Sequence, residues 1–221
     1  MKKHFIFISL FLITMSSFGQ KKLLPPKMEI KDPVLKEFIS NLKNAVKKKD
    51  KEYILSILSS DILVSFGGNG GIEEFKSRWN WSSDDSSFWK TMDKILQLGG
   101  EKYKGGGIYS IPYVFSNWPR DDEKYGAFEH MAITGTNVNV RNNPDLKKSE
   151  IVGQFSYDIV KVDYEKSIRS IDETIWYYTE SLDGKLKGYV FRDYIWSPVG
   201  YRATFEFIDN EWKMTVFVGG D

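Results

Sequence analysis

The chain has 221 residues, of which 41% are hydrophobic and 15% aromatic, so it can form packed cores and is not wholly disordered. Its 31 basic and 30 acidic side chains nearly balance, which argues against a nucleic-acid partner. The absence of cysteine excludes a disulfide framework, a thiolate nucleophile and the residue on which a lipoprotein anchor is built.

Residues 1–19 have the pattern of a signal peptide. Two lysines near the start precede an apolar run over residues 5–13, and Ser17 and Gly19 are small residues at the spacing of a cleavage site. The apolar run is shorter than the roughly 20 residues of a membrane-spanning helix. We therefore expect cleavage after Gly19, no stable membrane anchor in the mature protein, and a periplasmic or secreted location.

Only one histidine, His130, follows the predicted cleavage site. Zinc sites in hydrolases usually use two or three imidazoles, and a Ser-His-Asp triad needs a histidine within a fixed network. His130 stands just before a predicted strand, without neighbours at ligand spacing. We interpret it as structural, and we predict no catalytic residue, no metal site and no cofactor.

Residues 20–32 are basic and contain prolines, a composition that predicts an extended lead-in acting as a tether. The following residues, 33–130, are predicted to form a mainly helical α+β region. Its first helix covers about residues 33–48, with Asp32 as the N-cap and Pro33 at the first helical position.

Three further helices and one strand are expected in this region. The lysines at 47–49 face the negative end of the first helix dipole, so we interpret them as a helix end and not as a binding patch. Asp50 then caps a second helix that includes Leu58. The remaining elements are a strand at the start of residues 61–71, a helix over 71–79 and a helix within 86–100.

Two segments after these helices are expected to lack regular structure. Residues 98–107, "LGGEKYKGGG", have no Gly-Lys-Ser/Thr ending, so they predict flexible turns and not a phosphate-binding loop. Residues 109–119, "YSIPYVFSNWP", predict an aromatic connection interrupted by proline.

Four carboxylates support an alternative, catalytic interpretation. Glu73 and Glu74 lie in the first turn of a predicted helix, where the helix dipole is a sufficient structural reason for both. In the alternative, one of them is a general acid opposite Asp84 or Asp85, as in glycoside hydrolysis. Adjacency in sequence does not fix the separation of carboxylates that this chemistry needs.

From about residue 131 the pattern changes to short strands separated by turn signals. Val138 and Val140 alternate with polar residues, and residues 158–164, "DIVKVDY", alternate again. The runs "TIWYYTES" and "KGYVFRDYI" flank the turn "LDGK". Several strands within this length predict a small β-barrel at residues 131–197.

Four segments of this region occur in the order of a known family. They are "TNVNVRNNP" for a first strand and loop, "SEIVGQFSYDIVKV" for a second hairpin, Trp176 before the next strand, and "GKLKGYVFRDYI" for the closing turn. Together they resemble the bacterial SH3-like domain family found on exported proteins, over about residues 131–197. The chain departs from the family between Tyr164 and Thr174, where a longer loop is expected.

The resemblance implies a targeting or recognition module, often one that contacts cell-wall peptides and is attached to cysteine peptidases or zinc amidases. Without cysteine, this chain cannot be such a peptidase. A small barrel can bind an extended ligand through aromatic faces and a few polar groups. The candidate ligand-binding residues are Arg141, Asn142, Trp176, Tyr178, Tyr189 and Tyr194. Alternatively, Trp176 and Tyr189 are core residues and Arg141 closes a turn; a ligand carboxylate would favour Arg141.

Residues 198–221 contain the clearest hairpin pattern in the chain. Asp209 and Asn210 supply the turn, and one face of each strand is apolar. These faces are formed by Tyr201, Ala203, Phe205 and Phe207, and by Trp212, Met214, Val216 and Val218. Because a lone hairpin is unstable in water, we expect it to pack on residues 33–130, in an α+β unit that resembles the nuclear transport factor 2 type of cone.

The leading hypothesis is therefore an exported, non-catalytic binding or accessory protein of α+β fold, whose SH3-like barrel recognises peptidoglycan peptide or an envelope protein. One alternative is a cell-envelope hydrolase that uses the carboxylates named above. Another is that both regions only mediate protein assembly, since exposed aromatic residues suit an interface as well as a small ligand.

Overall fold

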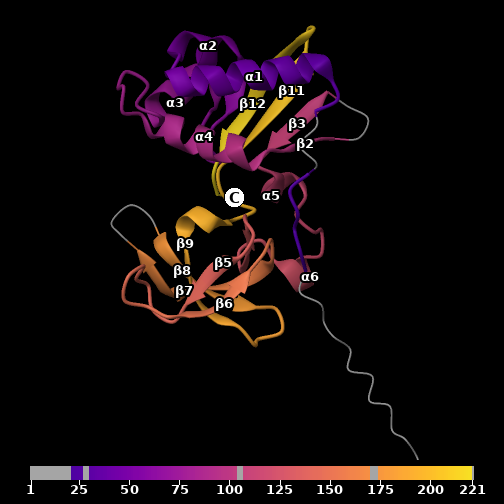
Figure 1. The fold of residues 1–221 in the computed structure, drawn as a ribbon. Coiled ribbons are helices and arrows are strands. Elements are labelled where there is room, and N and C mark those ends of the chain that lie inside the picture. The colour runs from indigo at the N-terminus through magenta and orange to yellow at the C-terminus, as the bar shows by residue number, and fades with distance from the viewer. Residues whose placement is uncertain (1–20, 27–29, 104–106, 170–173, 221) are drawn as a thin grey trace, which may run out of the picture.

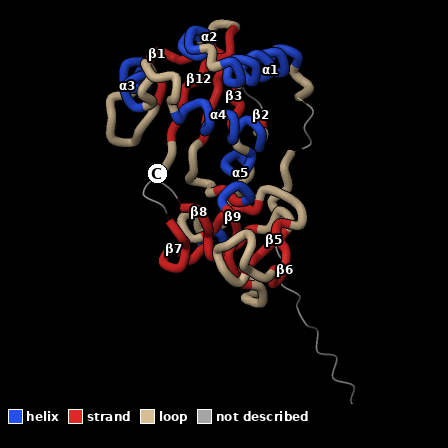
Figure 2. Tube along the Cα trace, turned by 60° about the vertical axis from the view of Figure 1, so that its left-hand side comes forward, coloured by secondary structure: helices blue, strands red, loops and turns tan. Residues whose placement is uncertain are grey.

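The computed structural model describes residues 21–26, 30–103, 107–169 and 174–220. The predicted signal peptide, residues 1–19, lies outside the described residues. The chain is of the α+β class, with 28% helix and 35% strand. Figures 1 and 2 show the longer helices gathered over one sheet, with a second sheet at the opposite end of the molecule.

The first helix, α1 (Pro33–Lys48), confirms the predicted helix. Asp32 caps it, because its Oδ1 accepts hydrogen bonds from the backbone N–H groups of Val34 at 3.0 Å and Leu35 at 3.2 Å. The helix ends at Lys49, which has a left-handed backbone conformation. The buried residues of α1 are Leu35, Phe38, Ile39, Leu42, Ala45 and Val46.

Three further helices also occur where the sequence predicts them. They are α2 (Lys51–Ser56), α3 (Gly71–Arg78) and α4 (Ser87–Leu98). Asp50 caps α2 by accepting from the N–H of Tyr53 at 3.0 Å, and Ser86 caps α4 by accepting from the N–H of Phe88 at 3.3 Å. One boundary is wrong: α2 ends at Ser56, and Leu58 begins a strand.

The first sheet has the strand order β1-β12-β11-β3-β2. Its strands are β1 (Leu58–Leu63), β2 (Glu101–Lys102), β3 (Ile108–Ile111), β11 (Arg202–Ile208) and β12 (Glu211–Val218). β1 runs parallel to β12, and the other neighbours are antiparallel. The order brings the C-terminal hairpin into the middle of a sheet whose other strands come from the N-terminal half.

The predictions for residues 98–107 and 109–119 are wrong in part, because β2 and β3 lie in or next to them. A short helix, α5 (Tyr113–Ser116), also falls in the segment predicted as a connection. β3 pairs with β11, which follows much later in the chain. A short strand that is stabilised by such a distant partner cannot be predicted from its own few residues.

The turn between β11 and β12 follows the sequence closely. Asp209 and Asn210 have φ angles of 49° and 65°, which suit a tight hairpin turn. The register of the hairpin shifts between Thr204 and Phe205, however. The shift acts as a β-bulge, so Phe217 is buried where the alternation predicted Val216.

Phe88 occupies the centre of the core under the helices. Its ring is fully buried, and its centroid lies between 5.1 Å and 5.8 Å from those of five other rings. These rings belong to Phe75, Trp79, Trp81, Trp89 and Phe217. The helices and the C-terminal hairpin thus share one hydrophobic core.

The second sheet has the order β10-β4-β7-β8-β9-β5-β6 and is curled into a half barrel. Its strands are β4 (His130–Ile133), β5 (Val138–Arg141), β6 (Ile151–Phe155), β7 (Ile159–Arg169), β8 (Thr174–Ser181), β9 (Lys187–Phe191) and β10 (Ile195–Trp196). A 3₁₀ turn, η1 (Arg192–Tyr194), joins the last two. The hydrophobic core of this second sheet includes Met131, Val140, Phe155, Val160 and Val190.

The long loop predicted between Tyr164 and Thr174 is mostly strand. β7 continues to Arg169 and pairs with β8, with register shifts between Asp163 and Ile168. The longer loop was expected from the departure of this segment from the family pattern, whereas the strand in fact continues and Ile168 and Arg169 pair with β8. Residues 170–173 lie outside the described part of the chain.

The lead-in, predicted to be an extended tether, docks on the second sheet instead. Lys22 forms a β-bridge with Asp158, and the N–H of Leu23 donates to the carbonyl of Tyr157 at 2.7 Å. Leu23 is buried in a hydrophobic cluster that packs on the second sheet. The other buried members are Tyr113 and Val114 of α5, Tyr125 of the short helix α6 (Asp122–Tyr125), Ala132 of β4 and Ile159 of β7.

Lys22→Met is expected to destabilise this junction. Lys22 Nζ lies 2.6 Å from Oδ1 of the buried Asp158, so the substitution leaves a buried carboxylate without its cation. The expected loss is about 1–3 kcal/mol in the free energy of unfolding, measured in urea. Adding Asp158→Asn should recover part of it, and Lys21→Met is the matched control. A stability equal to that of the unchanged protein would contradict the assignment.

Candidate functional site

Three of the candidate residues form a row across neighbouring strands of the second sheet. Arg141 of β5 stands opposite Tyr189 of β9, and Tyr189 stands opposite Tyr178 of β8. Residues directly opposite each other in antiparallel strands point to the same face. Their neighbours Val140 and Val190 belong to the core of the half barrel, so the row lies on the other face.

The two tyrosines form the apolar centre of the row. Their ring centroids are 5.1 Å apart with an interplanar angle of 77°, and both side chains are half-buried. Lys166 Nζ lies 5.1 Å from the centroid of Tyr178. It also lies 2.6 Å from Oδ2 of Asp163, which raises the pKa of Lys166 and keeps it cationic.

Lys166 and Asp163 were not among the candidates from the sequence. Asp163 Oδ1 accepts from the N–H groups of Glu165 and Lys166, each at 3.1 Å, in an Asx turn within the bulge of β7. Ser167 Oγ accepts from the N–H of Tyr178 at 3.1 Å and ties this bulge to β8. The sequence signal that could have predicted this turn is an aspartate followed by a short polar run.

Arg141 closes one end of the row and also ties down a loop. Its Nη1 donates to the carbonyl oxygen of Ser149 at 3.2 Å and to Ser149 Oγ at 3.1 Å. Asn142 pairs with Glu150 through the backbone, and its Oδ1 accepts from the N–H of Glu150 at 3.0 Å. Asn142 thus shapes the loop, and the alternative that Arg141 closes a turn is also compatible with these bonds.

Trp176 and Tyr194 have different surroundings. Trp176 is only 6% exposed and packs edge-on against Phe191, with centroids 5.2 Å apart. Tyr194 is 51% exposed in η1, next to Asp193, whose carbonyl oxygen accepts from Nζ of Lys94 in α4 at 2.7 Å. The face of the row is therefore formed by Arg141, Tyr178 and Tyr189. Trp176 lies beside the row, where it packs against Phe191 and is largely buried.

The row can hold an extended ligand by simple chemistry. Half-exposed aromatic rings offer flat apolar area at a low entropic cost, and cations at the two ends can bind an anionic group. Arg141 presents a planar guanidinium, which suits a carboxylate, whereas Lys166 is already paired with Asp163. The arrangement provides binding groups and no activated nucleophile.

The carboxylates of the catalytic alternative have structural partners. Glu74 accepts from Ser65 Oγ at 2.6 Å and from the N–H of Gly70 at 2.8 Å, so it closes the glycine-rich turn before α3. The hydrogen bond from Ser65 is the main reason that the pKa of Glu74 is lowered. Glu73 pairs with Lys76 at 2.8 Å on the helix surface.

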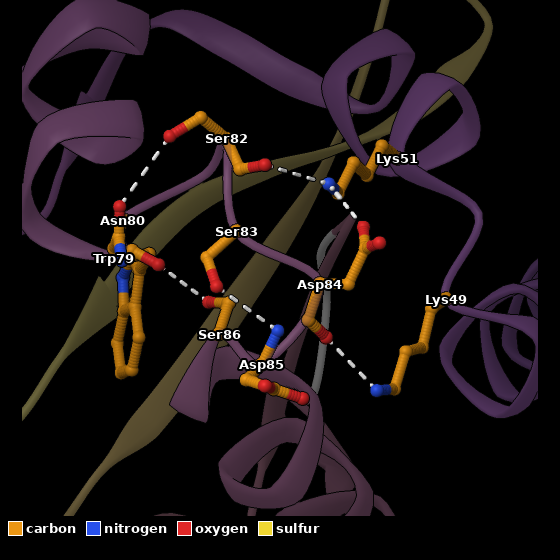
Figure 3. Close-up of polar contacts among 9 residues, drawn as sticks. All are labelled: Lys49, Lys51, Trp79, Asn80, Ser82, Ser83, Asp84, Asp85 and Ser86. Carbon is orange, nitrogen blue, oxygen red and sulfur yellow. Dashed lines mark hydrogen bonds and ion pairs between the residues drawn. The ribbon is translucent and has the colours of Figure 1, made fainter.

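Asp84 belongs to a loop that two lysines hold against the start of α2, as Figure 3 shows. Lys51 Nζ lies 2.9 Å from Asp84 Oδ1, and Lys49 Nζ donates to the Asp84 carbonyl oxygen at 2.9 Å. The bond from Lys51 lowers the pKa of Asp84. A general acid needs a raised pKa, so the lowered values at Glu74 and Asp84 do not support glycoside hydrolysis.

His130, which we interpret as structural, lies at the start of β4. It is buried, its Nδ1 lies 3.1 Å from the carbonyl oxygen of Gly126, and its ring meets Tyr125 edge-on. Within the described part of the chain, no three histidine, aspartate or glutamate residues gather as a metal site would require. None of the helices among the described residues is long and apolar enough to cross a membrane.

Comparisons with family models, with curated proteins and with solved structures gave no match to this chain.

Proposed function

We propose that this protein is an exported, non-catalytic binding or accessory protein. In this proposal the second sheet is an SH3-like module, and it recognises cell-wall peptide or an envelope protein through the row of Arg141, Tyr189 and Tyr178. The observation that carries the proposal is that one cation and two tyrosines, from three different strands, lie side by side on the face opposite the core. The first sheet and its helices serve as the scaffold.

The row suits a peptide that carries a free carboxylate. The guanidinium of Arg141 is held in place by Ser149, which reduces the side-chain entropy lost on binding. The tyrosine pair supplies the apolar area beside it. Peptides of the cell wall end in carboxylates, so they combine the two features that the row can recognise.

The test is co-sedimentation of the chain from residue 20 onward with isolated sacculi. Tyr178→Ala and Arg141→Gln are expected to weaken binding about tenfold each, since an anchoring aromatic or arginine residue at a binding face contributes on this scale. Trp176→Ala is a poorer choice, because Trp176 is buried and its loss would disturb packing.

Tyr103→Ala is the matched control, because Tyr103 is an exposed tyrosine beside the first sheet. It should sediment like the unchanged protein. Equal sedimentation of all variants and the unchanged protein would show that the row does not bind the sacculi. No sedimentation of the unchanged protein would exclude wall recognition and leave protein assembly as the working alternative.

A further inference from the structure

A hollow of about 450 Å³ lies between α1 and α4. Lys43 and Lys47 of α1 and Lys90 of α4 line it. Lys43 and Lys47 are four residues apart, so they share one face of α1. The volume is within the range of small-molecule sites.

Positive charge exceeds negative charge around this hollow, because three lysines and one carboxylate, that of Asp93, line it. Lys43, Lys47 and Lys90 form no ion pair or hydrogen bond with any residue that the structure describes. Three unpaired cations in one hollow favour an anionic ligand.

Uncharged and acidic groups line the same hollow. Asn44 projects from α1, and Asp93 accepts a hydrogen bond from Gln97 Nε2 at 2.6 Å on α4. Trp89 also lines it; its side chain is 5% exposed, and its buried indole N–H has no acceptor among the described residues. Four other tryptophans among the described residues, Trp79, Trp81, Trp196 and Trp212, also have a buried indole N–H without an acceptor, so this feature does not single out the hollow.

We propose that this hollow binds a sugar that carries a phosphate or carboxylate group. The three lysines hold the anion as point charges. Asn44, Asp93 and Gln97 provide donors and acceptors for ring hydroxyl groups. The site is on the helices of the first sheet, so it is independent of the row proposed above, and either one can fail without the other.

The lysines of the hollow could not be assigned from the sequence. The run at 47–49 has a sufficient explanation as a helix end, and Lys49 indeed donates to the carbonyl oxygen of Asp84. Lys47, however, lines the hollow together with Lys43, and Lys90 of α4 lines it from the other side. Only the packing of α1 against α4 puts the three together.

The experiment is calorimetric titration of the chain from residue 20 onward with glucose 6-phosphate, glucose and inorganic phosphate at low salt. Glucose 6-phosphate should bind with a dissociation constant on the order of 1 mM or below, and each of its two parts should bind more weakly. Lys43→Gln/Lys47→Gln should weaken binding of glucose 6-phosphate about tenfold, because charge-assisted bonds to phosphate are lost.

Lys36→Gln/Lys48→Gln is the matched control, with the same change of charge on the same helix but outside the hollow. It should bind like the unchanged protein, and thermal melting confirms that both variants fold. Three results would overturn the proposal: no saturable heat with glucose 6-phosphate, equally tight binding of inorganic phosphate alone, or equal weakening by the control pair.

Discussion

A chain that ends at Ser197 is expected to lose the cooperative melting of its helical region. β12 lies between β1 and β11, and β11 lies between β12 and β3, so the truncation removes the two strands that join the first sheet. The core also loses five buried side chains, those of Ala203, Phe205, Trp212, Met214 and Phe217.

The magnitude follows from burial. Each large apolar side chain contributes about 1.5–3 kcal/mol when buried, and the sum is comparable to the about 5–15 kcal/mol by which a domain is stable. Far-UV circular dichroism, which reports helix content, measures the transition. Phe207→Ala, on the same hairpin but 42% exposed, is the control and should melt almost like the unchanged protein. Unchanged helical melting of the truncated chain would refute the shared core.

Phe88→Ala should be the most damaging single substitution at the centre of that core. Its ring is fully buried among Phe75, Trp79, Trp81, Trp89 and Phe217. Removal of a buried phenylalanine ring costs about 3–5 kcal/mol, from lost transfer energy and from the cavity that remains. The cap from Ser86 uses the backbone N–H of residue 88 and stays in place.

Chemical denaturation measures this loss, with Phe128→Ala as the matched control. Phe128 is 61% exposed, so its truncation should change the free energy of unfolding by less than about 0.5 kcal/mol. A loss at Phe88 no larger than at Phe128 would show that the ring cluster does not support the core.

The helices illustrate which features can be predicted from local sequence. Asp32 and Asp50 stand one residue before α1 and α2, and each caps its helix through a side-chain oxygen. Caps and apolar periodicity act within about one helical turn, so the residues that decide them are neighbours in the sequence. The turn at Asp209 and Asn210 is local in the same sense.

The strands show the limit of this reasoning. β3 was not predicted within its aromatic segment, because its pairing partner is β11 near the other end of the chain. The bulge in β12, opposite Thr204 and Phe205, exchanged Val216 for Phe217 in the core, and alternation alone cannot place a bulge. The sequence of a strand does not state its partner.

The candidate face combines both kinds of information. Arg141, Tyr178 and Tyr189 were named from their motifs, but only the register of β5, β9 and β8 places them in one row. Trp176, chosen for the same reason, is largely covered by packing. Lys166 contacts Tyr178 from a bulge in a segment that the family resemblance assigned to a loop.

The sequence by itself determined the helix starts, the C-terminal turn, the α+β class and the lack of any thiol chemistry, because these depend on composition or on residues a few positions apart. The tertiary structure alone decided which strands pair, that Leu23 of the lead-in is buried against the second sheet, and that lysines of α1 and α4 surround one hollow. These features arise from contacts between segments that are distant in the sequence. The free energy of such contacts depends on the whole core, so no single segment predicts them.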